Sequence, residues 1–168
     1  MPLSMHDLSV PVFVRAFHNL SAILDKGVTF AASEGVSADT LTGGRLIGDM
    51  GPLTAQIQRA SDSAKGCVAR LAGITVPSFA DTETTFPELQ KRINDTIELL
   101  QSIAPSQIDG SEDRNIDLKF GERRLTMTGR DYLLGFALPN FFFHVTTAYA
   151  ILRHKGVPVG KVDFLGLS

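Results

Sequence analysis

Apolar residues recur every three or four positions over three long stretches of the chain, a spacing that predicts three amphipathic helices. The stretches cover residues 8–32, 46–71 and 86–103. Gly35 and Gly73 follow the first two stretches, and glycine commonly ends a helix because it adopts a left-handed backbone without strain. The first two thirds of the chain are therefore expected to be helices that each bury one face.

Residues 130–155 predict a fourth helix, which is apolar on almost every side. The segment 132–152 has no charged residue and is long enough to span a bilayer. It also contains Pro139 and the polar pair Asn140 and His144, and three amphipathic helices need an apolar helix to pack against. We therefore expect the central helix of a soluble bundle and no membrane partner, with a kink or restart at Pro139.

Two short runs of alternating residues, 115–120 and 125–128, flank a turn that contains Gly121, which predicts a β-hairpin. Residues 157–168 are expected to be extended and to pack on the bundle. The predicted fold class is therefore all-α, a four-helix bundle with a short β-hairpin between the third and fourth helices. A single domain is expected to cover residues 1–168.

The composition is that of an ordinary globular protein: of 168 residues, 43% are hydrophobic and 20% are charged, and the net charge is −2. The basic residues form no cluster, so we expect no nucleic-acid partner. No basic group precedes the first apolar stretch, which argues against a signal peptide. The single cysteine, Cys67, excludes an internal disulfide and favours a cytoplasmic location. It lies near apolar helix positions, so a small buried side chain is expected there.

Candidate chemistry centres on Asn140 and His144, which are four residues apart and therefore neighbours on one helix face. A helix can supply two ligands to one metal ion with this spacing. A third ligand must come from another helix, and Asp49 is the best candidate because it is an acid within an apolar stretch beside Met50. Pro52, three residues later, either bends that helix or starts a new one.

An alternative interpretation makes His144 a core histidine that is hydrogen-bonded to a backbone or acidic group. Polar residues of the second helix leave a similar choice open, because either a pocket wall or a solvated helix face explains them. These residues are Gln56, Gln58, Asp62 and Lys65.

Three segments resemble an uncharacterised bacterial domain-of-unknown-function family of the DinB/YfiT-like superfamily, which is associated with metalloenzymes. The segments are residues 49–65, D-M-G-P-L-T-A-Q-I-Q-R-A-S-D-S-A-K; residues 69–73, A-R-L-A-G; and residues 139–166, which begin P-N-F-F-F-H-V-T-T-A-Y-A-I-L-R-H-K-G. The resemblance implies a DinB-like four-helix bundle with a long crossover between the second and third helices.

The superfamily resemblance also implies a site with three histidines around a divalent metal, one from the second helix and two from an H-x-x-x-H on the last helix. His144 matches the second histidine of that pair, Asn140 occupies the position of the first, and Asp49 falls near the position on the second helix. The resemblance further implies a homodimer and thiol-dependent transferase or hydrolase activity.

Two hypotheses follow for these residues. In the first, the protein is a non-catalytic or small-ligand-binding bundle with a degenerate metal site formed by Asp49, Asn140 and His144. In the second, the same three residues hold a divalent metal for a hydrolase or a thiol-dependent transferase. The sequence identifies no substrate for either.

Overall fold

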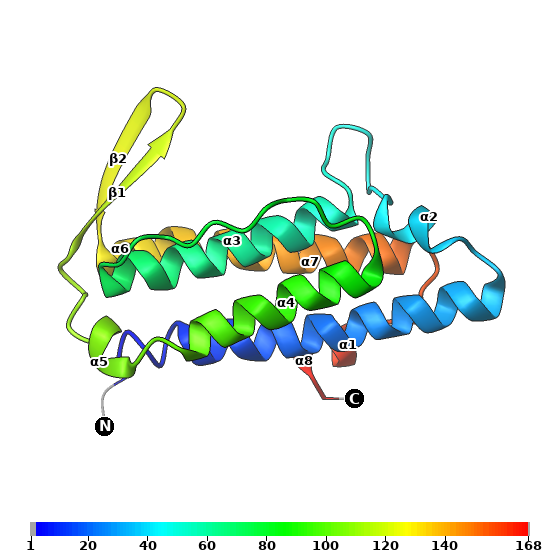
Figure 1. Cartoon of the computed structure of the whole chain (residues 1–168), viewed down its shortest axis with the longest axis horizontal. Helices are drawn as coiled ribbons and strands as arrows, with labels where there is room; N and C mark the ends of the chain where they lie inside the picture. Colours follow the sequence, from blue (N-terminus) through cyan, green and yellow to red (C-terminus); the bar gives the residue numbers. More distant parts are fainter. Residues whose placement is uncertain (1–2, 168) are drawn as a thin grey trace.

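Four long helices form the body of the computed structural model, which describes residues 3–167 (Figure 1). α3 packs against α4 and α7, and α1 packs against the same two helices, so the four close into a ring. α1 and α7 run in one direction and α3 and α4 in the other (Figure 1). The predicted four-helix bundle is confirmed. The bounds are α1 Val10–Glu34, α3 Leu53–Ala72, α4 Phe86–Gln101 and α7 Leu138–His154.

Shorter elements connect and extend the bundle. Their bounds are α2 Ala38–Thr42, α5 Pro105–Ile108, β1 Asn115–Phe120, β2 Arg123–Thr128, α6 Gly129–Tyr132, a π-helix Leu133–Ala137 and α8 Lys161–Leu165. The tail after residue 156 packs on the bundle as predicted, but it is not extended throughout, because α8 forms there and contacts α1. Asp163 supports the first turn of α8 by accepting a hydrogen bond of 2.7 Å from the backbone N–H of Gly160.

Aromatic side chains from α1 and α7 form the centre of the core. The ring of Phe141 meets the rings of Phe13 and Phe17 edge-on, at centroid distances of 4.8 and 5.1 Å, and all three side chains are fully buried. Edge-to-face pairs of this kind add stability beyond the burial of apolar area. The apolar character of α7 is therefore explained by packing, and no helix within residues 3–167 is long and apolar enough to cross a membrane.

The second long helix begins later than the sequence pattern predicts. α3 starts at Leu53, and residues 43–52 form a loop. Pro52 precedes the first helical residue, and proline disfavours helical backbone at the residue before it, Gly51. Of the two alternatives for Pro52, a fresh helix start is the one observed. Asp49 consequently lies on an exposed loop and not on a helix face.

A kink or a restart was predicted at Pro139, and no restart occurs, because the helical backbone continues from residue 129 to residue 154. A π-helical turn, Leu133–Ala137, lies directly before α7, and the N–H of Leu138 bonds to the carbonyl of Leu133 across it. Prolines and π-turns are both positions at which long helices bend. Single π-turns are often found beside functional sites, and this one directly precedes Asn140.

The predicted hairpin is also present and stands away from the bundle (Figure 1). β1 and β2 pair in antiparallel fashion from Asn115↔Thr128 to Phe120↔Arg123. The two-residue turn begins with Gly121 at φ 60°, a positive value that glycine adopts easily. Thr128 then starts α6, because its hydroxyl accepts a hydrogen bond of 3.2 Å from the backbone N–H of Asp131.

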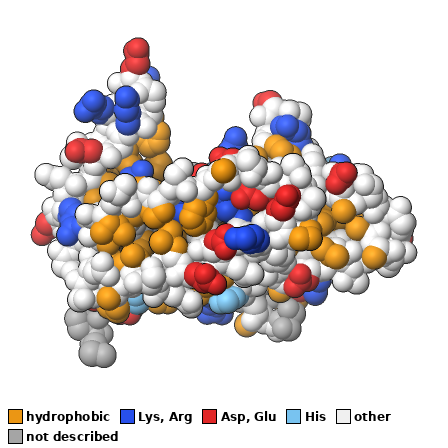
Figure 2. Space-filling model, viewed as in Figure 1, with side chains coloured by type: hydrophobic (Ala, Val, Ile, Leu, Met, Phe, Trp, Pro, Cys, Tyr) orange, Lys and Arg blue, Asp and Glu red, His pale blue; other side chains and the backbone are white. Residues whose placement is uncertain are grey.

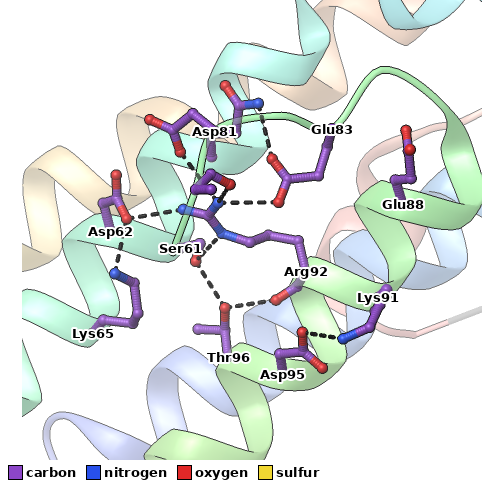
Figure 3. A network of polar contacts seen from close by, with 12 residues as sticks. Ser61, Asp62, Lys65, Asp81, Glu83, Glu88, Lys91, Arg92, Asp95 and Thr96 are labelled. Carbon is purple, nitrogen blue, oxygen red and sulfur yellow. Dashed lines mark hydrogen bonds and ion pairs between the residues drawn. The ribbon is translucent and has the colours of Figure 1, made fainter. Parts of the chain in front are cut away.

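A long connection, residues 73–85, runs back along the bundle from the end of α3 to the start of α4 (Figure 1). Arg92 of α4 holds this connection and is only 2% exposed. Its guanidinium donates to the carbonyl of Ala80 at 3.0 Å and to the carboxylates of Asp81 and Glu83, each at 3.1 Å (Figure 3). One buried cation therefore fixes three groups of the crossover.

The same guanidinium also reaches α3. It donates to Ser61 at 2.8 Å and to the Asp62 carboxylate at 2.9 Å (Figure 3). Lys65, which is 3% exposed, pairs with Asp62 at 3.0 Å and donates to the carbonyl of Pro77 at 2.7 Å. Arg92 and Lys65 thus connect α3, α4 and the crossover, and the five N–H donors of arginine suit it to this many acceptors.

Replacement of Arg92 by methionine is expected to lower the free energy of unfolding by about 3 kcal/mol, because Glu83, the carbonyl of Ala80 and the hydroxyl of Ser61 lose a buried partner. Urea unfolding followed by circular dichroism measures this change. The matched control is Lys91→Met on the same helix, since Lys91 is 74% exposed and pairs with Asp95 in solvent. That variant should lose at most about 1 kcal/mol. Equal losses would contradict the assignment of Arg92 as the residue that holds the crossover.

Candidate functional site

A cavity of about 270 Å³ lies between α3, the start of α7 and the hairpin. Ligand pockets commonly measure about 300–1,000 Å³, so this cavity suits a small ligand. α3 contributes Arg59, Asp62, Ser63 and Arg70; the chain from α6 to α7 contributes Tyr132, Phe136, Asn140 and His144; and β1 contributes Leu118, Lys119 and Phe120. Two of the three residues predicted for the site, Asn140 and His144, are therefore brought together in one cavity wall.

His144 is held in one orientation by Gln56 of α3. The side-chain amide of Gln56 donates from Nε2 to the carbonyl of Gly51 at 2.9 Å, so its Oε1 faces His144. The Nδ1 atom of His144 lies 2.8 Å from that oxygen. Because an amide oxygen only accepts, Nδ1 must carry the proton and donate it. The neutral ring then presents an unprotonated Nε2, for which the described residues supply no hydrogen-bond donor.

The environment of His144 favours this neutral form. The side chain is 9% exposed, and burial together with the positive charge of Arg59 lowers the pKa of His144 from 6.5 to about 4. At neutral pH the residue is therefore a hydrogen-bond acceptor within the cavity wall. It can accept a proton or a hydrogen bond from a ligand, which are the two roles of a neutral imidazole.

Asn140 is fixed by a short chain of hydrogen bonds. Its Nδ2 donates to the hydroxyl of Ser63 at 3.2 Å, and that hydroxyl donates in turn to the carbonyl of Ala137, the last residue of the π-helix, at 3.4 Å. The Oδ1 atom of Asn140 remains as an acceptor in the cavity lining. The two predicted residues thus offer two acceptors, and their other polar atoms are committed to neighbours.

The cavity carries an excess of positive charge. Arg59, Arg70 and Lys119 line it, and none of the three forms an ion pair within residues 3–167. The one acid in the lining, Asp62, is matched by Lys65 and Arg92 behind it. An anionic ligand is therefore favoured over a cationic one.

The end of the cavity beside the hairpin is aromatic. Phe136 lies between Phe120 of β1, at a centroid distance of 5.5 Å, and Tyr132, at 6.0 Å in a stacked arrangement. Arg70 donates to the hydroxyl of Tyr132 at 3.1 Å. Burial raises the pKa of Tyr132 to about 12, so the phenol keeps its proton. Figure 2 shows the hairpin and the loop before α3 as two projections with a hollow between them.

Asp49 is the predicted site residue that the structure does not place with the others. It is exposed on the loop before α3 and is not part of the cavity lining. The sequence pattern was misread there, because the glycines and Pro52 of residues 43–52 break the helix on which Asp49 was expected to lie. The side chain of the second long helix that meets His144 is Gln56.

The residues present are a poor fit to the divalent metal that the superfamily resemblance implies. Asp49, the expected third ligand, lies outside the cavity, and the side chain of α3 that meets His144 is Gln56, whose oxygen already accepts a hydrogen bond from the imidazole. Two free acceptors remain, neither of them charged, whereas zinc sites use three or four protein ligands and magnesium sites use carboxylates. Across residues 3–167, no three His, Cys, Asp or Glu side chains gather closely enough to hold a metal ion.

Cys67 is a structural residue. The thiol is fully buried, and burial raises its pKa, so it stays protonated. The expectation of a small buried side chain is therefore confirmed.

The hydrogen bond to Gln56 predicts which ring nitrogen of His144 is protonated. Long-range ¹H–¹⁵N NMR spectra of the imidazole should show Nδ1 protonated and Nε2 bare at pH 7. His154 at the exposed end of α7 provides the comparison within the same spectrum. In the Gln56→Leu variant the preference for a proton on Nδ1 should weaken, because the oxygen that accepts a hydrogen bond from Nδ1 is removed. A protonated Nε2 in the wild type would contradict the network.

The lowered pKa of His144 predicts a loss of stability in acid. Between pH 6.5 and about 4, His144 is protonated in the unfolded chain but stays neutral in the folded chain. The free energy of unfolding therefore falls as the pH drops through this range. The contribution of His144 to this loss is on the order of 2 kcal/mol. It is measured as the difference between wild type and His144→Gln in urea unfolding at several pH values. His154→Gln is the control and should follow the wild type.

Comparison with known proteins identifies the family. The model of a domain of unknown function, DUF1993, matches residues 5–165. No curated protein matches the chain. The crystal structure of a DinB family member from Shewanella denitrificans is similar, with a TM-score of 0.87 and 39% sequence identity over 96% of this chain and 91% of that chain. The protein therefore belongs to the DUF1993 family, a domain-of-unknown-function family with the DinB-like fold.

Proposed function

We propose that this protein binds a small molecule, without a resident metal, in the cavity between α3 and α7. The observation that carries the proposal is the hydrogen bond between His144 Nδ1 and Gln56 Oε1, at 2.8 Å. This bond fixes the imidazole so that its bare Nε2 acts as an acceptor for a ligand. A preorganised acceptor of this kind binds a donor without further ordering of the side chain.

The cavity has the other properties of a small-ligand site. It combines a few fixed polar groups, Asn140 and His144, with an aromatic wall at Phe136 and a surplus of cations. Apolar walls provide the affinity in such sites, and a small number of placed polar groups determine orientation.

A metal-dependent enzyme is the less supported function. Gln56 bonds to His144 through its oxygen and to Gly51 through its nitrogen, and these two bonds fix the orientation of its amide. A metal would have to break this arrangement to gain a third ligand. The neutral imidazole can instead serve as a proton acceptor for a bound molecule.

Two measurements on protein purified without a histidine tag test the proposal. Titration with Zn²⁺ or Mn²⁺ in a calorimeter should show no stoichiometric binding that depends on His144. A screen of small aromatic acids, alcohols and amides by ¹H–¹⁵N NMR should shift the amide signals of Ser63, Asn140 and His144 for a subset of the compounds.

The control variants for these measurements are His144→Leu, which removes the acceptor, and His154→Gln, which alters an exposed histidine on the same helix. Ligand-induced shifts should be lost in the first and kept in the second. A stoichiometric metal that disappears in His144→Leu would overturn the proposal in favour of a metal-dependent function.

We also propose, from the superfamily resemblance, that the protein forms a homodimer. Its test is the molar mass in solution by light scattering, with twice the chain mass as the expected value. A cytoplasmic location likewise stays a prediction.

A further inference from the structure

We propose that the ligand of the cavity is a carboxylate with an O–H or N–H donor on the adjacent carbon and a flat apolar group at its other end. The inference deepens the proposed function and rests on it, since it assigns a chemical class to the same cavity. Each part of the ligand corresponds to one part of the cavity wall.

The carboxylate is assigned to Arg59. This side chain lines the cavity, and its charge is felt by His144, yet within the described chain it has no hydrogen bond or ion pair. A guanidinium matches a carboxylate with two parallel N–H···O bonds. Arg70 is a poorer site, because one of its donors is already committed to the hydroxyl of Tyr132. Arg59 is the guanidinium of the lining for which no hydrogen bond is found among the described residues, and its two parallel N–H groups suit a carboxylate better than a phosphate, which usually takes several donors.

The adjacent donor is assigned to His144. Its unprotonated Nε2 can only accept a hydrogen bond. A carboxylate without a neighbouring donor would place an oxygen, which also only accepts, against this nitrogen. A hydroxyl or amide N–H next to the carboxylate resolves this conflict, because it gives Nε2 a proton donor while the carboxylate lies against Arg59. The charged side chains of the lining are Arg59, Asp62 and Arg70 from α3 and Lys119 from β1, and Asp62 is already paired with Lys65 and Arg92.

The flat apolar group is assigned to the aromatic end. On α3, Arg59 and Arg70 are eleven positions apart, which places them roughly 16 Å from each other along the helix axis. One small carboxylate therefore cannot contact both. The tail of the ligand must extend from Arg59 past Asn140 toward Phe136, Tyr132 and Phe120, whose rings form the far wall. Offset stacking of aromatic rings suits a flat tail.

Three matched probes separate these contributions in NMR titrations of the full chain. 2-Hydroxy-4-phenylbutanoate carries all three features, 4-phenylbutanoate lacks the hydroxyl, and 2-hydroxy-4-phenylbutanamide lacks the charge. The hydroxy acid is expected to bind about tenfold more tightly than either analogue, because each analogue loses one hydrogen bond to a charged or preorganised group.

Variants assign each loss to a residue. In Arg59→Gln the hydroxy acid and its amide should bind equally, and in His144→Leu the hydroxy acid and 4-phenylbutanoate should bind equally. Arg123→Gln removes the same charge from the exposed hairpin tip, outside the cavity lining, and should leave the affinities unchanged.

The outcomes distinguish the inference from the proposed function. Equal affinity of the wild type for acid and amide would overturn the carboxylate assignment but leave small-molecule binding intact. Equal weakening by Arg59→Gln and Arg123→Gln would also overturn it, because general electrostatics would then explain the effect. If no probe shifts the signals of Ser63, Asn140 or His144, the proposed function itself fails.

Discussion

The structure depends on one buried cation, Arg92, more than on any other polar group. The consecutive helices α3 and α4 run in the same direction (Figure 1). The chain must therefore return along the whole length of the bundle between them, and it does so without forming a helix. The backbone N–H and C=O groups of such a segment lack the hydrogen bonds that a helix would provide, so they need other hydrogen-bond partners. Arg92 supplies donors to the crossover and to α3 together. Buried ion pairs are often no more stabilising than apolar contacts, but they select one arrangement among several.

Asp62 links that arrangement to the cavity. Its carboxylate pairs with Lys65 and Arg92 on one side, and its side chain lines the cavity on the other. Asp62 is thus paired with cations other than Arg59, and within the described chain Arg59 stays an unpaired cation in the lining. Asp62 therefore belongs both to the network that joins α4, α3 and the crossover and to the lining of the cavity.

Much of this architecture was predictable from local sequence patterns. Apolar periodicity identified the helices, and the four-residue spacing placed Asn140 and His144 on one cavity wall. The sequence presents Gln56 as one of several polar residues, although a glutamine beside the apolar positions of α3 is a signal for a buried partner. Asp49 was misplaced because periodicity continued across Gly51 and Pro52, where backbone chemistry ends the helix. The roles of Arg59 and Lys119 have no local signal, since they depend on how the hairpin and α3 meet.

The π-helical turn before α7 has a consequence for the evolution of this site. A π-turn holds one residue more than an α-helical turn, so the residues before it are rotated by about 100° relative to those after it. Loss of one residue from Leu133–Ala137 would let the helix continue without interruption. It would also swing Tyr132 and the attached hairpin around the helix axis, away from Arg70. The number of residues in this turn is therefore a structural constraint of its own, beside the identity of the side chains that line the cavity.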